Sequence, residues 1–209
     1  MLRLSVHFAV VTKQLRSVPV MRAVLDAVAE RLLTGDEVRI RIPEICVATG
    51  VNYGSVYHHF GSREGVIDAA YESLFVTYAE NEIVRWGALE SAESRRDFDE
   101  VLRGLLDPAD HDSALSERAM TARIVAAAET RPLLRDVVVM TQARVSEARA
   151  RALAHGQDRG WLRSDASAAA MAGLVESVSA RFGAEDFLEP AASPTEVARL
   201  VWQCLRDAR

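Results

Sequence analysis

Apolar residues recur at intervals of three and four along most of the chain, which is the pattern of amphipathic α-helices. In the first clear segment, 18–34, the apolar stripe includes Val20, Val24 and Val28, with proline near the start and glycine directly after the end. The same reasoning predicts eight further helices, at 43–49, 53–59, 63–87, 98–106, 115–130, 132–155, 165–183 and 194–208. The pattern therefore predicts an all-α protein of about nine helices.

Strict alternation of apolar and polar residues is confined to Leu2–Val10, which is too isolated to form a sheet. This stretch superficially resembles a secretory signal, but it is short, is interrupted by a histidine and precedes no small-residue cleavage site. No apolar run approaches the roughly 20 residues that a membrane-spanning helix needs. We therefore expect a cytoplasmic protein.

Composition is that of a folded protein and excludes a wholly disordered chain. Of the 209 residues, 49% are hydrophobic and 26% are charged. Residues 1–64 hold eight Lys and Arg against six Asp and Glu, a formal charge of +2, whereas residues 65–209 hold seventeen against twenty-four, a formal charge of -7. A polyanion would therefore be met by the N-terminal segment.

The chain has two cysteines, Cys46 and Cys204, which lie far apart in sequence and each in an apolar helical pattern. This placement predicts two reduced thiols in the core rather than a disulfide.

The segment 42–63 has the pattern of two short helices joined by a tight turn. Gly50 permits the positive φ that such a turn needs, and apolar residues on both helices can fix them at a steep angle. The second helix is then expected to protrude. Asn52 is a good cap for it, which leaves the N-terminal amides and their partial positive charge directed outward, toward a phosphate or a base edge.

Beside the apolar positions Val56 and Phe60, the second helix presents neutral polar side chains that can donate to phosphates or read groove edges. Gly54 would allow the backbone to approach a surface closely. The candidate DNA-binding residues are Arg41, Asn52, Tyr53, Gly54, Ser55, Tyr57, His58, His59, Ser62 and Arg63.

At these residues the chain resembles the TetR family of bacterial transcriptional repressors. The resemblance covers residues 18–75 and rests on the run Tyr57-His58-His59-Phe60-Gly61-Ser62-Arg63, in which Arg63 stands where the family usually has Lys. It implies a helix-turn-helix domain at 17–64 with a connecting helix at 63–87, and a ligand-binding and dimerisation domain at 88–209. Residues 1–16 would form an N-terminal arm, either frayed or reaching a minor groove through Arg3, Lys13 and Arg16.

The resemblance further implies a homodimer formed by the last two helices, at about 165–183 and 194–208, on a palindromic DNA operator. Small residues follow one face of the first of these helices: Ala166, Ala169, Ala170, Gly173, Ser177 and Ala180. Such a face permits close helix approach, although it is more often part of an ordinary core, and only the family resemblance favours an interface. The last helix offers Val197, Leu200, Val201, Cys204 and Leu205.

A small-molecule effector is implied as the second partner. Six residues of the C-terminal part are candidates for its pocket, although Met and aromatic residues at helical spacing are also usual core residues. They are Trp86, Phe98, Met120, Arg123, Ile124 and Met140. Arg123 among apolar neighbours either seeks a partner or lies on the solvated face.

No enzyme is predicted, because the sequence contains none of the common nucleotide-binding, zinc-protease or serine-hydrolase motifs. No cofactor or metal is implied either. Asp107, Asp110, His111 and Asp112 could bind a divalent ion, but a solvated acidic turn is the simpler interpretation.

The function predicted is that of a ligand-responsive transcriptional regulator, a repressor released from its operator by the effector. The alternative is an all-helical protein-interaction module whose DNA-binding head is non-functional.

Overall fold

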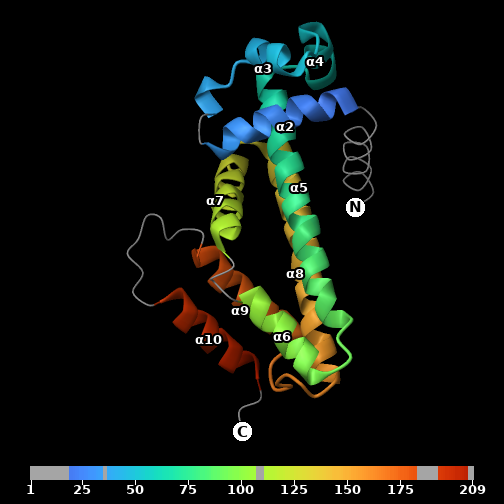
Figure 1. Ribbon diagram of the computed structural model, residues 1–209, viewed down its shortest axis with the longest axis vertical. Coiled ribbons are helices and arrows are strands. Elements are labelled where there is room, and N and C mark those ends of the chain that lie inside the picture. Colours follow the sequence, from blue (N-terminus) through green and yellow to red (C-terminus); the bar gives the residue numbers. More distant parts are fainter. Residues whose placement is uncertain (1–18, 35–36, 107–110, 183–192, 207–209) are drawn as a thin grey trace. The chain divides into compact units, whose positions relative to one another are not determined.

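The computed structural model describes residues 19–34, 37–106, 111–182 and 193–206. Within these ranges it contains nine α-helices, one 3-10 helix and no strand, which confirms the all-α fold (Figure 1). The elements are α2 (Pro19–Leu33), η1 (Glu37–Arg39), α3 (Ile42–Thr49), α4 (Tyr53–Phe60), α5 (Arg63–Glu90), α6 (Arg95–Leu106), α7 (His111–Ala128), α8 (Pro132–Asp158), α9 (Ala168–Phe182) and α10 (Pro194–Leu205).

The chain divides into two compact units. The first contains Met1–Val76 and Ala127–Val138, and the second contains Thr77–Ala126 and Val139–Arg209. Helices α5 and α8 therefore each contribute residues to both units. Residues 127–138, which the sequence analysis grouped with the C-terminal domain, lie in the first unit.

The core of the first unit is built from the apolar stripes that the helical periodicity indicated. Val24 and Val28 of α2, Ile45 of α3, Val56 of α4 and Val66 of α5 are each completely buried. Phe60, which was expected to be buried as well, is only half-buried.

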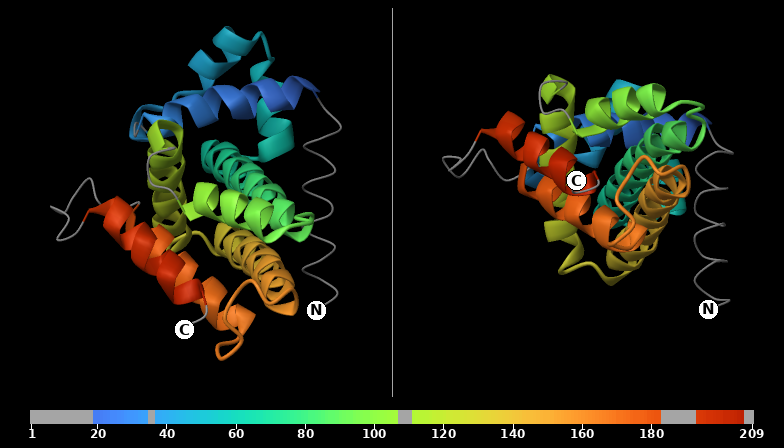
Figure 2. Two further views of the ribbon diagram at one scale, coloured as in Figure 1. Left: turned by 60° about the horizontal axis from the view of Figure 1, so that its bottom comes forward. Right: turned by 90° about the horizontal axis from the view of Figure 1, so that it is seen from below.

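The second unit has its own core, to which α5, α6, α8, α9 and α10 contribute. Its buried cluster includes Trp86, Phe98, Leu153, Leu162 and Val201. Helix α10 lies alongside α9 (Figure 2). Each unit thus has a core of apolar side chains from helices that are distant in sequence.

One detail of the sequence analysis was wrong. Cys204 is exposed rather than in the core, because it lies at the side of the stripe formed by the buried Val201 and Leu205, whereas Cys46 is buried as expected. Ser193 precedes α10, and its side chain makes no capping hydrogen bond. The N-terminal arm and residues 107–110 lie outside the described residues, as do the side chains of His111 and Asp112.

No helix in the described ranges combines the length and the apolar character needed to cross a membrane.

Candidate nucleic-acid interface

Helices α3 and α4 form a helix-turn-helix at one end of the first unit (Figure 1). The turn between them depends on Gly50, whose φ of 68° lies in the left-handed region that favours glycine. Asn52 caps α4, since its side-chain Oδ1 accepts a hydrogen bond from the backbone N–H of Gly54 at 2.8 Å. Both local predictions, the turn and the cap, are confirmed.

The junction of α4 with α5 depends on two further residues. Ser62 caps α5 through its hydroxyl, which accepts a hydrogen bond from the Gly65 N–H at 3.0 Å. At Gly65 itself, any Cβ would collide with the backbone carbonyl oxygen of Phe60, the last residue of α4. The absence of a side chain there lets α5 start directly against the end of α4, which fixes the direction in which α4 projects.

The outer face of α4 carries most of the predicted DNA-binding residues. Asn52, Tyr53, Gly54, Ser55 and His58 are exposed, and Tyr53 is 47% exposed despite its large ring. Two further candidates, Tyr57 and His59, are half-buried.

Ring contacts fix several of these side chains. The rings of Tyr53 and Tyr57 pack with centroids 4.5 Å apart and planes tilted by 34°, and His59 meets Phe60 edge to face at 4.7 Å. A side-chain hydrogen bond with Tyr53 raises the pKa of Tyr57 above its ordinary value. The two phenols therefore form one ordered unit at the start of α4.

The two predicted cations of the interface differ in their surroundings. Arg63 is turned inward: its Nε donates to the carbonyl of Ile40 at 3.0 Å and one terminal nitrogen donates to the carbonyl of Glu37 at 2.5 Å. The other terminal nitrogen contacts Glu64 at 3.4 Å. This arrangement uses Arg63 to hold the η1 segment and does not favour the phosphate contact that the family resemblance implied. Arg41 is exposed and donates to the carbonyl of Val38 at 3.4 Å.

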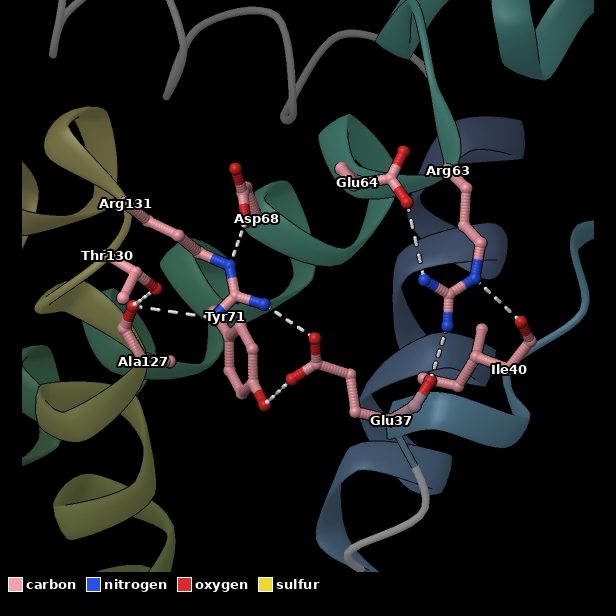
Figure 3. Close-up of polar contacts among 9 residues, drawn as sticks. All are labelled: Glu37, Ile40, Arg63, Glu64, Asp68, Tyr71, Ala127, Thr130 and Arg131. Carbon is pink, nitrogen blue, oxygen red and sulfur yellow. Dashed lines mark hydrogen bonds and ion pairs between the residues drawn. The ribbon is translucent and has the colours of Figure 1, made fainter.

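A polar cluster that sequence reasoning missed joins three segments of the first unit (Figure 3). Arg131, between α7 and α8, contacts Glu37 of η1 at 2.5 Å and Asp68 of α5 at 2.9 Å. The hydroxyl of Tyr71 donates to the other oxygen of Glu37 at 2.8 Å, and the Arg131 guanidinium lies 5.6 Å from the Tyr71 ring centroid. Because Arg131 and Glu37 are 94 residues apart, no local sequence pattern could have indicated this contact.

Carboxylates outnumber cations in this region, and two of them are partly desolvated. Burial raises the pKa of Asp68, against the opposing effect of Arg131. Burial, with the charge of Asp68 as a second cause, raises the pKa of Glu72 to about 7.

The predicted effector residues are not gathered in one place. Trp86 and Phe98 belong to the same buried cluster of the second unit, whereas Met120 and Ile124 are buried outside that cluster. Met140 is half-buried, and Arg123 lies on the exposed side of α7. Four of the six are thus buried in this structure, and their role in an effector pocket stays a prediction.

The second unit also contains a buried polar network that the sequence analysis missed. Arg149 is 4% exposed, and its guanidinium pairs with Glu82 at 2.8 Å and lies 3.9 Å from Glu176. Glu176 also accepts hydrogen bonds from Gln142 at 2.5 Å and Ser146 at 2.9 Å. The network ties α9 to α5 and α8.

The predicted dimer helices expose apolar and small side chains. On α9, Ala169, Ala170, Gly173 and Ser177 are exposed and Leu174 is 40% exposed. On α10, Leu200 is 50% exposed. These residues are left uncovered by the single chain.

Within the described residues, no three His, Cys, Asp or Glu side chains are placed to hold a metal ion. An all-helical protein with a projecting, capped second helix in a helix-turn-helix is a DNA-binding type of fold. Residues 39–70 match the family model of bacterial regulatory proteins of the tetR family, so the resemblance to TetR regulators is confirmed at the helix-turn-helix.

Solved structures share the fold over nearly the whole chain. A putative TetR-family transcriptional regulator from Rhodococcus sp. is 22% identical, with 88% of this chain and 95% of that one covered at a TM-score of 0.58. A putative transcriptional regulator from Saccharomonospora viridis in complex with choline is 16% identical, with 88% and 93% covered at a TM-score of 0.67.

The superantigen PfiT is also 16% identical, with 91% of this chain and 98% of that one covered at a TM-score of 0.64. No curated protein matches the chain significantly by sequence. At these identities the likenesses establish the fold, and the function has to be argued from the site.

Proposed function

We propose that this chain is a cytoplasmic, dimeric transcriptional repressor that binds a palindromic operator through α4 and is released by a small-molecule effector. The observation that carries the proposal is the outer face of α4. Its Asn52-capped start and its exposed Tyr53, Ser55 and His58 lie on a helix-turn-helix that matches the TetR family model. A helix so placed can enter a major groove, with its first residues at the base edges.

The charge distribution supports the same partner. The sequence up to residue 64 has a formal charge of +2, while the remainder carries -7, so the head is the part that a polyanion approaches most favourably. Two recognition helices in a symmetric dimer would need a separation of about 34 to 36 Å to enter successive major grooves.

The effector part of the proposal has separate support. Helices α5 and α8 each have residues in both units. A shift of either helix that an effector causes in the second unit can therefore be transmitted along the helix to the first unit. A solved structure with this fold contains choline, which supports a small molecule as the second partner. Coupling between two such sites is typically 1 to 3 kcal/mol, and it is reciprocal.

The test of DNA binding is selection of genomic fragments by the purified full-length chain, with sequencing of the bound fraction and salt titration of the binding. We expect a palindromic site whose affinity falls steeply with salt. Replacing Ser55 with Glu, which points a carboxylate from α4 at the phosphates, should weaken binding more than about tenfold.

Ser91→Glu provides the matched control, because it makes the same charge change at an exposed position of the second unit. If both variants lose the same DNA affinity, the loss is due to the change in net charge. If the chain shows no salt-sensitive binding to any duplex, the proposal is refuted. The alternative, a protein-interaction module with a non-functional head, expects neither variant to alter retention of DNA.

A further inference from the structure

The base-reading chemistry of α4 is unusually restricted. Its sequence, Tyr53 to Phe60, contains no Arg, Lys, Asn, Gln, Asp or Glu. Those six residue types make the strong polar contacts to base edges in the major groove: Arg and Lys with guanine, Asn and Gln with adenine, Asp and Glu with cytosine. What remains for α4 is apolar contact with the 5-methyl group of thymine, helped by single hydrogen bonds from hydroxyl and imidazole groups.

The polar residues that flank α4 do not restore the missing chemistry. The Oδ1 of Asn52 is engaged by the N–H of Gly54, whereas bidentate recognition of adenine would use that oxygen together with the side-chain amide N–H. The guanidinium of Arg63 is bound to the carbonyls of Ile40 and Glu37. Neither residue is therefore available for its usual base contact.

Tyr53 is the residue best placed to read a methyl group. It is the first residue of α4, in the turn that meets base edges in helix-turn-helix proteins, and the residue is 47% exposed. Packing on Tyr57 at 4.5 Å holds the ring in one orientation, which lowers the entropy lost when it contacts DNA. Gly54 follows directly and adds no side chain that would keep the backbone away from the groove.

We propose that α4 recognises its half-site chiefly by a thymine methyl group packed against the Tyr53 ring, and that no bidentate contact to guanine contributes. This inference rests on the proposed DNA-binding function and names the base chemistry that the function uses. It predicts a half-site in which one A·T pair has a fixed orientation, since only one strand presents the methyl at a given place in the groove.

The test uses the selected operator with each thymine of the half-site replaced in turn by uracil, which removes the methyl and keeps the base pair. Affinity of the full-length chain is measured at one fixed salt concentration. At one position we expect a loss of about fourfold per half-site, or about fifteenfold when both half-sites are changed, from the burial of one methyl group.

Substitutions at Tyr53 test whether its ring causes the preference for thymine over uracil. Tyr53→Ala should bind the thymine and uracil duplexes equally, whereas Tyr53→Phe should keep the preference. Val84→Ala, at a 73% exposed position of α5 in the second unit, should match the unaltered chain in both affinity and preference. Because Tyr53 is half exposed, circular dichroism of Tyr53→Ala should show unchanged helix content.

Binding that is indifferent to every uracil replacement would overturn the inference while leaving the proposed function intact. The same conclusion would follow if 7-deazaguanine, which lacks the N7 acceptor, weakened binding more than any uracil. A chain that binds no duplex at all would overturn the proposed function together with this inference.

Discussion

Arg131 connects separate segments of the first unit through its ion pairs. Its guanidinium contacts Glu37 and Asp68, and all three side chains are only 24% to 35% exposed. Arg131→Gln would leave both carboxylates partly desolvated without a cation. We expect the free energy of unfolding to fall by about 1 to 2 kcal/mol, between the values usual for exposed and for buried pairs. Urea denaturation at neutral pH measures the difference.

Arg135→Gln is the matched control for this change. Arg135 is exposed, and its guanidinium donates to the backbone carbonyl of Glu129 rather than to a carboxylate. Its replacement should alter the free energy of unfolding by no more than about 0.5 kcal/mol. Equal effects of the two substitutions would show that the ion pairs of Arg131 contribute nothing to stability.

Glu72 makes the stability of the first unit decrease as the pH rises. Its pKa is raised from 4.5 to about 7 by burial and by the nearby Asp68. Between these two values the folded protein keeps a proton at Glu72 that the unfolded chain has released, so this group lowers the free energy of unfolding as pH rises through the range. Above pH 7 its effect should level off.

Glu72→Gln removes that titration, so the variant should lose less stability than the unaltered chain between pH 5 and pH 7.5. The measurement is the urea midpoint at several pH values. Glu44→Gln, at an exposed position of α3 in the same unit, should leave the pH profile of the unaltered chain in place. If the Glu72→Gln profile instead matches that of the unaltered chain, the half-buried Glu72 carboxyl is not the source of the slope.

The residue scale is also where sequence reasoning was least complete. The caps formed by Asn52 and Ser62 could be predicted, because a cap involves residues two or three positions apart. The inward course of Arg63 could not, because its acceptors on Ile40 and Glu37 are 23 and 26 residues away. A local sequence pattern can indicate a cation at position 63, but it cannot indicate which distant carbonyl groups accept its hydrogen bonds.

At the scale of elements, Gly65 sets the packing of α5 against α4. A methyl group there would overlap the carbonyl of Phe60, and backbone cannot move aside as a flexible side chain can. Gly65→Ala should therefore shift α4 and cost about 1 to 3 kcal/mol or more in stability, with loss of operator binding. Thermal unfolding and a binding titration measure the two effects.

Gly87→Ala tests whether the effect of Gly65→Ala is due to this contact. It lies on the same helix with nothing within 4 Å of the added Cβ, so the change should be neutral or stabilising by up to about 1 kcal/mol. If Gly65→Ala behaved likewise, the close approach would have no role in positioning α4.

The elements themselves were predictable because helical periodicity and boundary residues are local signals. The ends of α3, α4 and α10 differ from prediction by at most three residues. Helix α6 likewise begins three residues before its predicted start, at Arg95 rather than 98. A local cap explains this start, because the Ser94 hydroxyl accepts a hydrogen bond from the Asp97 N–H and donates one to the Asp97 carboxylate. Buried networks such as that of Arg149 combine three helices and have no periodic signature.

For the whole molecule, dimerisation makes the sharpest prediction. Leu174 of α9 and Leu200 of α10 are 40% and 50% exposed in the single chain, and they lie on the two helices that the family resemblance assigns to the dimer interface. The double variant Leu174→Glu/Leu200→Glu should be monomeric in sedimentation experiments at concentrations where the unaltered chain is dimeric. The control Leu133→Glu/Val139→Glu, at positions 66% and 62% exposed on α8, should remain a dimer.

Operator binding then separates the contribution of the dimer from that of the head. A monomeric variant with an intact α4 should retain the weak affinity of the unaltered head for a single half-site, because the substitutions lie in the second unit. Its affinity for the full palindrome should fall by about 100-fold or more, since the second head no longer binds at high effective concentration. Equal losses on the single half-site and the palindrome would instead show that the α9 and α10 substitutions damage the head, and the proposed interface would then have no support from the experiment.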